Sequence, residues 1–364
     1  MINMAEQKIP WYKRELLIMP VSKVDVVTMT KNFSIMLEAG LTVPECLEVL
    51  VDQSGGKLRK ILQRVNSDVQ SGDLLGDALE PARRIFGPIF VSSVKVGESS
   101  GTLSQNLTYV ASQMDRELEV RRNIQGAMLY PAIIVIATVI LGFGLATFIL
   151  PQMTRLFKSL DIELPWTTRV LIWIADVFGQ YGLIIAPIMI GFFIFLFWLV
   201  RQKFMEPITH RFLLLLPGVR DFVHDINRAR FCRSIGTMLQ SGIPIQEGLE
   251  IVQGVMTNCV YRKSVERMYE SITSGESFAE LVAKYPRLYP KMVERMIVVG
   301  ERSGSMADTL IYLAKFYEEK VAIKAKNLAS IIEPILLIFI GIGVGFVAVS
   351  IFTPIYSVTE GLTF

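Results

Sequence analysis

Three long stretches without a single charged residue constrain the fold of this 364-residue chain more than any other feature. Residues 131–150, 177–200 and 334–358 each lack Asp, Glu, Lys and Arg. An α-helix rises about 1.5 Å per residue, so about 20 apolar residues match a hydrocarbon core of roughly 30 Å. The alternative for 177–200 is a buried helix of a large soluble core. Together the three stretches predict a membrane protein with three transmembrane helices.

Basic residues beside these stretches predict the orientation, because Lys and Arg near a span stay preferentially on the cytoplasmic side. The tail after residue 358 has no basic residue, whereas clusters precede the first stretch, follow the second and precede the third. These clusters are Arg116, Arg121 and Arg122; Arg201, Lys203, Arg211 and Arg220; and Lys315, Lys320, Lys324 and Lys326. The loop after the first stretch carries three basic and three acidic residues, which weakens the contrast. We expect a cytoplasmic N-terminus without a signal peptide, and an extracytoplasmic C-terminus.

Charge and cysteine content argue against nucleic-acid binding and against a cysteine-ligated metal site. The net charge of +3 is the small difference between 37 basic and 34 acidic residues, so the chain has no general basic field and nucleic acid is not an expected partner. The cysteines Cys46, Cys232 and Cys259 form no CxxC or Cys/His spacing. We expect reduced, buried thiols, no metal centre and no cofactor.

An internal duplication organises the chain. Residues 36–50 (MLEAGLTVPECLEVL) align with residues 238–252 (MLQSGIPIQEGLEIV) at a spacing of 202, with six identities in fifteen. At a spacing of 203, GESSG at 97–101 aligns with GERSG at 300–304, and Tyr130 with Glu333. The duplication therefore includes the uncharged stretch that follows each copy, and 177–200 returns the chain to the cytoplasm between the copies.

Apolar residues recur at helical spacing in each copy, as at Val26, Met29, Phe33 and Met36, and strand-like alternation is nowhere sustained. The fold class we predict is an all-α membrane protein with two homologous cytoplasmic helical-bundle domains and three transmembrane helices. The predicted parts are a short N-terminal segment (1–24), a first cytoplasmic helical domain (25–126), transmembrane helix 1 (127–152), an extracytoplasmic loop (153–176), transmembrane helix 2 (177–200), a second cytoplasmic helical domain (201–328), transmembrane helix 3 (329–358) and an extracytoplasmic tail (359–364).

The duplicated motifs, in this order, closely resemble the inner-membrane platform family that type II secretion systems (the F protein) and type IV pilus assembly (the C protein) share. The resemblance extends from about residue 25 to 358. The motifs that carry it are the paired MLxAG and MLxSG turns, the paired GExSG turns, LPWTT at 164–168, ARF at 229–231 and IEP at 332–334.

This resemblance implies a scaffold at the centre of the machine, without enzymatic activity of its own. The implied partners are a cytoplasmic hexameric assembly ATPase, pilin or pseudopilin subunits, other inner-membrane assembly proteins, the lipid bilayer and further copies in a homo-oligomer. The nearest approach to a phosphate loop is SGGKL at 54–58, which lacks the upstream Gly and the Ser or Thr after Lys. We therefore expect a partner to hydrolyse ATP.

The candidate functional residues belong to the repeated turns and to the entry of the third span. Glu98 and Glu301 face the unfavourable negative end of their own helix dipole, so something else is expected to hold them. They either cap the next helix or pair with a nearby Arg inside the domain, or they contact a partner, a subunit or a divalent cation. Glu45 and Glu247 are possible companion carboxylates, and Glu45 and Glu98 are weak metal candidates. Glu333, at the cytoplasmic edge of the third span, either makes a contact with another helix or with pilin, or simply anchors the span at the membrane–water interface. The full set is Gly40, Gly97, Glu98, Gly101, Gly242, Gly300, Glu301, Gly304, Glu333 and Pro334.

Two other classes of function fit the sequence less well. A small membrane transporter or permease needs a polar pathway through the bilayer, and the three uncharged stretches offer essentially none. A membrane-bound enzyme needs clustered acid, base or nucleophile residues, and no such motif stands out. His210 and His224 have no partners at metal-ligand spacing, so a surface or core histidine is the simpler interpretation of each.

Overall fold

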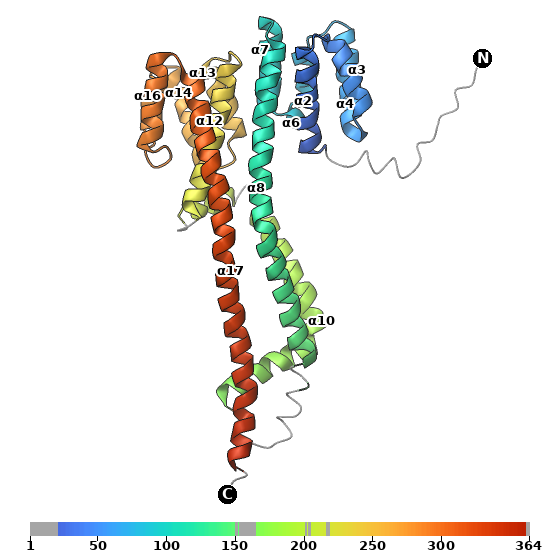
Figure 1. The fold of residues 1–364 in the computed structure, drawn as a ribbon, viewed down its shortest axis with the longest axis vertical. Helices are drawn as coiled ribbons and strands as arrows, with labels where there is room; N and C mark the ends of the chain where they lie inside the picture. Colours follow the sequence, from blue (N-terminus) through green and yellow to red (C-terminus); the bar gives the residue numbers. More distant parts are fainter. Residues whose placement is uncertain are drawn as a thin grey trace, which may run out of the picture. The chain divides into compact units, whose positions relative to one another are not determined.

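The computed structural model describes residues 21–149, 165–200, 205–215 and 219–361, together with residues 152 and 202. Its contacts divide the chain into two units. The first joins Met1–Arg122 with His210–Val321, and the second joins Asn123–Thr209 with Ala322–Phe364. All regular structure in the described residues is helical (Figure 1).

The first unit contains two similar sets of helices, which we call repeat 1 (residues 21–122) and repeat 2 (residues 219–321). Repeat 1 consists of α2 (Lys23–Glu38), α3 (Val43–Gln53), α4 (Gly56–Gln70), α5 (Leu75–Leu79), η1 (Glu80–Ala82), α6 (Arg83–Phe86), α7 (Pro88–Ser100) and the start of α8 (Leu103–Gly144). Repeat 2 consists of α12 (Arg220–Gln240), α13 (Ile245–Val255), α14 (Cys259–Ile272), α15 (Phe278–Ala283), α16 (Lys291–Ser303) and the start of α17 (Met306–Gly361). By the spacing of the duplication, α2, α3, α4, α5, α7 and α8 correspond to α12 to α17 in order.

The same glycine turn ends the first helix of each repeat. Gly40 has φ +92° and Gly242 has φ +80°, a region that residues with a Cβ rarely adopt. The amide of Leu41 donates to the Met36 carbonyl, 3.1 Å away, and that of Ile243 to the Met238 carbonyl, 2.9 Å away. These bonds satisfy carbonyls that the helix end would otherwise leave unpaired. Both glycines therefore close the C-terminal end of the first helix of their repeat.

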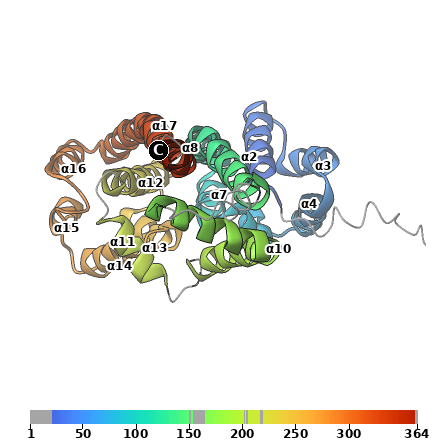
Figure 2. The ribbon, with the colours of Figure 1, turned by 90° about the horizontal axis from the view of Figure 1, so that it is seen from below.

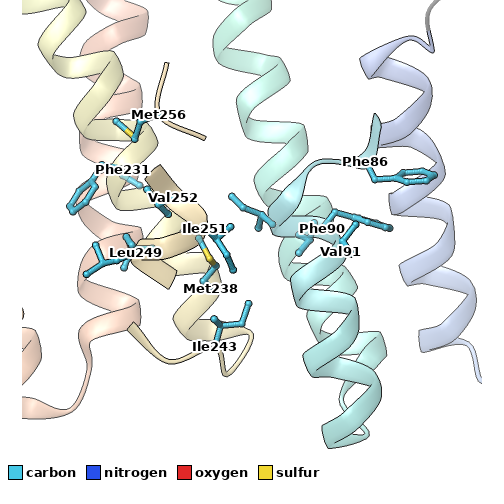
Figure 3. Packing of buried hydrophobic residues seen from close by; sticks show 14 of the residues in the cluster. Phe86, Phe90, Val91, Phe231, Met238, Ile243, Leu249, Ile251, Val252 and Met256 are labelled. Carbon is cyan, nitrogen blue, oxygen red and sulfur yellow. The ribbon is translucent and has the colours of Figure 1, made fainter. Parts of the chain in front are cut away.

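The core of the first unit is a continuous apolar cluster with members from both repeats (Figure 3). Phe90 and Val91 of α7 belong to it, as do Met238 of α12 and Leu249 of α13. Apolar residues three or four apart on a helix share one face, and these faces are the ones that the cluster buries. Cys46 and Cys232 are buried in the same core as free thiols, and Cys259 is half-buried. Burial raises the pKa of the Cys232 thiol to about 12, which keeps it protonated and unreactive.

The second unit contains the distal parts of α8 and α17, the π-helix η2 (Leu145–Ile149) and α10 (Trp166–Val200). Leu103–Gly144 and Met306–Thr353 are long and apolar enough to cross a membrane, and only 6% of each apolar stretch is buried within the chain. A core helix of a soluble protein would be buried, so these apolar surfaces need another apolar environment. The predicted span 177–200 lies within α10, which begins inside the predicted loop 153–176.

Polar and apolar contacts join the helices of the second unit. The Thr168 hydroxyl donates to the Ser350 carbonyl, 2.8 Å away, in a buried position. Leu171 and Ala175 of α10 are buried against α17. Helix α10 therefore packs against α17, and its Phe178 ring contacts Phe143 of α8 edge to face, with ring centroids 5.9 Å apart. A last short helix, α11 (Glu206–Leu213), leads back to the first unit.

Candidate functional site

The Glu98 carboxylate lies at the amino end of another helix of repeat 1. Its two oxygens accept hydrogen bonds from the backbone amides of Leu75 (2.7 Å) and Gly76 (3.0 Å), the first residues of α5. These amides have no acceptor within their own helix, and the residue before them, Leu74, has no capping side chain. The carboxylate at the end of α7 thus completes the start of α5 and interacts favourably with its dipole.

Glu301 does the same in repeat 2. Its oxygens accept hydrogen bonds from the amides of Phe278 (3.2 Å) and Ala279 (3.4 Å), the first residues of α15. This helix also has a cap of its own, because the Ser277 hydroxyl accepts from the Glu280 amide at 3.2 Å. Each glutamate therefore caps a helix, but the prediction that this would be the next helix is wrong. The capped helix lies 22 to 23 residues earlier in the chain.

The first glycine of each GExSG turn allows two helices to approach closely. A Cβ added at Gly97 would lie 2.9 Å from the Leu103 Cα. One at Gly300 would lie 2.8 Å from the Thr309 Oγ1 and 3.2 Å from the Met306 Cα. Real Cβ atoms do not tolerate such contacts, and backbone cannot move aside as a flexible side chain does. The sequence therefore needs glycine where α7 crosses α8 and where α16 crosses α17.

The remaining residues of the motif close the turn. The Ser100 hydroxyl donates to the Val96 carbonyl at 2.7 Å, and the Ser303 hydroxyl donates to the Val299 carbonyl at 2.8 Å. Gly101 and Gly304 end the helices in the left-handed conformation, at φ +70° and +69°. Each residue that the two GExSG copies share thus has a structural role, either in the turn or at the end of a neighbouring helix.

Glu45 has a different environment from Glu98. Its carboxylate accepts hydrogen bonds from both the amide and the hydroxyl of Thr42, each 2.8 Å away, which forms a capping box at the start of α3. These hydrogen bonds lower the pKa of Glu45. In the described part of the chain, no three His, Cys, Asp or Glu side chains gather as ligands for a metal ion. A metal site at Glu45 or Glu98 stays a prediction.

Glu333 contacts the residue that corresponds to it in the first copy of the duplication. The Tyr130 hydroxyl of α8 donates to Glu333 Oε1 of α17 at 3.3 Å. Both side chains are exposed, and Pro334 beside Glu333 is exposed as well. This bond favours the inter-helix interpretation of Glu333 over simple anchoring. A contact with pilin stays a prediction.

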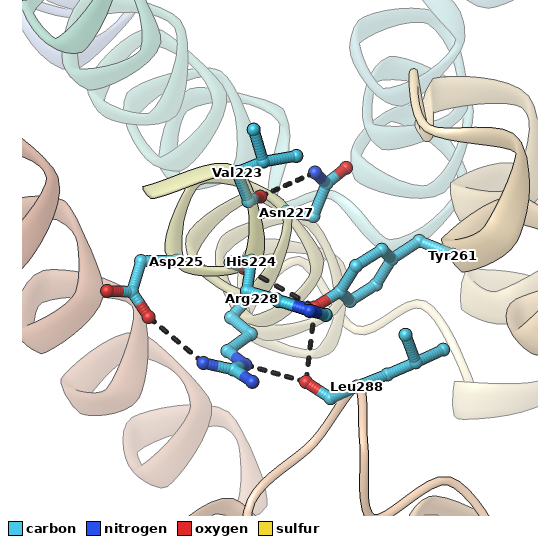
Figure 4. A network of polar contacts seen from close by, with 7 residues as sticks. All are labelled: Val223, His224, Asp225, Asn227, Arg228, Tyr261 and Leu288. Carbon is cyan, nitrogen blue, oxygen red and sulfur yellow. Dashed lines mark hydrogen bonds and ion pairs between the residues drawn. The ribbon is translucent and has the colours of Figure 1, made fainter. Parts of the chain in front are cut away.

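A buried polar network in repeat 2 was not predicted from the sequence (Figure 4). His224 Nδ1 lies 2.7 Å from the Tyr261 hydroxyl, which donates to the Leu288 carbonyl at 3.1 Å. Arg228 donates to the same carbonyl at 2.6 Å and pairs with Asp225 at 3.0 Å. Burial, reinforced by the positive charges of Arg228 and Arg220, lowers the pKa of His224 to about 4. His224 is therefore a neutral core histidine at pH 7.

The network links three segments that are far apart in the sequence, which is why periodicity alone gave no sign of it. Only Asp225 and Arg228, three residues apart on one helix, carry a recognisable local signal. His210, the other histidine, accepts a hydrogen bond from the Cys259 amide at 3.2 Å. Both histidines thus have structural partners.

A second polar feature differs between the repeats. Arg233 forms two hydrogen bonds with the Glu318 carboxylate, at 2.8 and 2.6 Å, and both side chains are largely buried, at 10% and 15% exposure. At the corresponding positions of repeat 1, Lys31 and Asp115 are 3.7 Å apart and exposed by 58% and 54%. The same ion pair is thus covered in one repeat and open in the other.

These features define a helical membrane protein whose repeated motifs hold helices together and form no reactive centre in the residues described. Comparison with known proteins gives the family. The family model described as type II secretion system (T2SS), protein F, matches residues 29–151 and again 231–354, at the spacing of the internal duplication. The chain belongs to this protein F family.

Several relatives extend over most of the chain. The type IV pilus assembly protein PilC of Thermus thermophilus is 32% identical over 340 residues, which cover 93% of this chain and 84% of that protein. The type IV pilus assembly protein TapC of Aeromonas hydrophila is 28% identical, with 93% and 83% covered. The type II secretion system protein F of Pseudomonas aeruginosa is 29% identical, with 92% and 83% covered. Pilus and secretion proteins thus match to a similar degree.

Proposed function

We propose that this protein is the inner-membrane platform of a type IV pilus or type II secretion machine, a scaffold on which filament subunits are assembled. The observation that carries the proposal is the double match to the protein F family, each copy ending in an apolar segment. The relatives are named for pilus assembly and for secretion, and the two long apolar helices of this chain suit a component of such a machine that lies in the membrane.

We infer a topology of three spans with the N-terminus in the cytoplasm and the C-terminus outside. Transmembrane helices at 127–152, 177–200 and 329–358 place the domains at 25–126 and 201–328 on the cytoplasmic side. The exposed apolar surfaces of α8 and α17 support two of these spans, and the helical course of α10 supports the third. The basic clusters beside the spans support the orientation.

The proposed partners are a cytoplasmic hexameric ATPase and pilin-like subunits in the membrane. Support for mechanical coupling comes from two helices that run without interruption out of the first unit: α8 has 42 residues and α17 has 56. At about 1.5 Å per residue these helices are roughly 60 and 80 Å long. Each repeat is therefore joined to the apolar segment that follows it by one helix.

Affinity purification from membranes in mild detergent tests the proposal. A tagged copy at native expression level is expected to retain a hexameric ATPase and pilin-like proteins, and deletion of its gene is expected to abolish surface filaments or secretion until the gene is restored. An unrelated three-span protein with the same tag serves as the control. Transport of a solute by the purified chain alone in vesicles, without loss of filaments or secretion in the deletion strain, would overturn the proposal.

A further inference from the structure

The two repeats of the first unit contact each other through different surfaces. Helix α7 of repeat 1 packs against α12 and α13 of repeat 2. A Cβ on Gly242 would lie 3.9 Å from Val96 Cγ1, and the Asn106 side chain donates to the Ser241 carbonyl at 3.1 Å. In the reciprocal contact, α16 of repeat 2 would pack against α2 and α3 of repeat 1. The described residues show no comparable packing between these helices. Such an interface joins two different surfaces and leaves one copy of each free.

The first free surface is on α16. Met292 and Val299 occupy the positions that correspond to Ile89 and Val96 of α7. Ile89 is 7% exposed and Val96 is half-buried, whereas Met292 is 40% and Val299 is 59% exposed. The side chains are apolar in both repeats, but only those of repeat 1 are covered. We call the α16 surface around Met292 and Val299 the head.

The second free surface is on α2 and α3. Val49 corresponds to Ile251, and Ile35 corresponds to Thr237. Ile251 and Thr237 are 7% and 2% exposed, whereas Val49 and Ile35 are 37% and 54% exposed. Lys31 and Asp115, the open counterpart of the covered Arg233–Glu318 pair, belong to the same repeat. We call the surface around Ile35 and Val49 the tail.

Charge distinguishes the two free surfaces from the internal contact. Where α7 has Ser92 and Ser99, the head has Arg295 and Arg302; where α12 has Gln240, the tail has Glu38. These arginines and Glu38 are exposed. The head is thus basic with an apolar centre, and the tail is acidic with an apolar centre, so the two complement each other in both respects.

We propose that the head of one copy binds the tail of a second copy of this chain, in a head-to-tail repetition of the internal contact. Helices α16 and α3 lie at opposite ends of the first unit in both views (Figures 1 and 2), so a chain cannot close this contact on itself. All copies share one orientation in a membrane, which makes the membrane normal the rotation axis between them. Such heterologous contacts form a ring or an open chain of copies.

Cysteine pairs in the full-length protein test the contact in membranes. Ala39, next to Gly40, corresponds to Ser241, and Val299 corresponds to Val96, so Ala39→Cys and Val299→Cys place one thiol on each surface. The background carries Cys259→Ser, because Cys46 and Cys232 are buried. With a short thiol-specific crosslinker, the double variant is expected to form a ladder of dimers and larger species. Two single variants expressed together are expected to stop at the dimer.

Gln63→Cys, an exposed residue of α4, replaces Ala39→Cys in the matched control and is expected to give no ladder with Val299→Cys. Self-crosslinking of Val299→Cys alone would show a two-fold contact and overturn the proposal, as would the absence of a ladder in a double variant that has wild-type abundance and thermal stability. Crosslinks to another protein only would overturn it too. This result is independent of the ATPase and pilin contacts, which the purification measures.

Charge exchange provides the second test. Arg302→Glu places an acidic head against the acidic tail, and the ladder is expected to disappear in the cysteine double variant. Adding Glu38→Arg restores the opposite charges and is expected to restore the ladder. Failure of Arg302→Glu to weaken the ladder, or of the second change to rescue it, would contradict the pairing of these surfaces.

Discussion

At the scale of the residue, Glu98 and Glu301 interact with a different helix from the one that contains them. A carboxylate in the last turn of α7 or α16 is unfavourable by the dipole of its own helix. Each one instead accepts two backbone amides of a short helix some 22 to 23 residues earlier. The unfavourable position within one helix is the sign of a favourable contact with another.

Glu98→Gln is expected to destabilise the protein more than Glu301→Gln. The glutamine amide group donates where the carboxylate oxygen accepted, and α5 has no other side-chain cap, so the loss should be roughly 1 to 2 kcal/mol. α15 retains Ser277 as its own cap, and a loss under about 1 kcal/mol is expected there. Thermal unfolding of the purified full-length variants, followed by circular dichroism, measures both values.

The same variants separate structure from function. If the glutamates also contact a partner, filament or secretion output should fall in both variants while the protein stays in the membrane. Unchanged output in the double variant would show that helix capping is their whole role. Equal destabilisation by the two single changes would contradict the difference in capping.

His224 is expected to make stability depend on pH. Its pKa is lowered from 6.5 to about 4, so the unfolded chain takes up a proton more readily than the folded one. The stabilisation is present above about pH 6.5 and is lost as the pH falls toward 4. Melting temperatures between pH 7 and 4 should therefore fall less steeply for His224→Gln than for the wild type; parallel curves would argue against this prediction.

At the scale of the element, the ion pairs at corresponding positions of the two repeats are expected to contribute differently to the free energy of unfolding. Breaking the buried pair by Arg233→Ala leaves the Glu318 carboxylate without compensation, and a loss of about 3 to 5 kcal/mol is expected. Lys31→Ala at the exposed counterpart is expected to cost less than about 1 kcal/mol. Denaturant unfolding of the two variants in detergent gives the comparison.

A compensated variant makes this prediction sharper. Arg233→Met combined with Glu318→Leu removes both charges together, and buried pairs replaced in this way are often neutral or stabilising. We expect most of the stability lost in Arg233→Ala to return. If the double variant were as unstable as the single one, packing around the pair would matter more than its charges.

At the scale of the whole molecule, the apolar helices and the charge pattern lead to a testable topology. Single cysteines at Gln152 and Trp166 flank the loop that should lie outside the membrane. Impermeant thiol reagents are expected to label them in whole cells once any outer barrier is opened, whereas a cysteine at Gln63 should react only after lysis. Labelling of Gln63→Cys but not of the loop in intact cells would reverse the orientation.

Sequence by itself determined the features that depend on neighbouring residues. Uncharged stretches long enough to cross a bilayer predicted the apolar helices α8 and α17. The paired MLxAG and MLxSG motifs predicted the turns at Gly40 and Gly242, and the repeated motifs together predicted the family. These signals are local because transfer into lipid, helix periodicity and glycine conformation are properties of a single segment.

Only the tertiary structure decided which helix end each glutamate caps, which polar groups meet in the core, and which of two equivalent surfaces is covered. Glu98 reaches α5, His224 reaches Tyr261, and Arg233 is buried where Lys31 is exposed. The duplication gives both repeats the same motifs at the same spacing, so it cannot show that α7 packs against α12 and α13 while the head and the tail stay exposed. That asymmetry arises because a single contact between two similar repeats joins two different surfaces, covering one copy of each and leaving the other copy exposed.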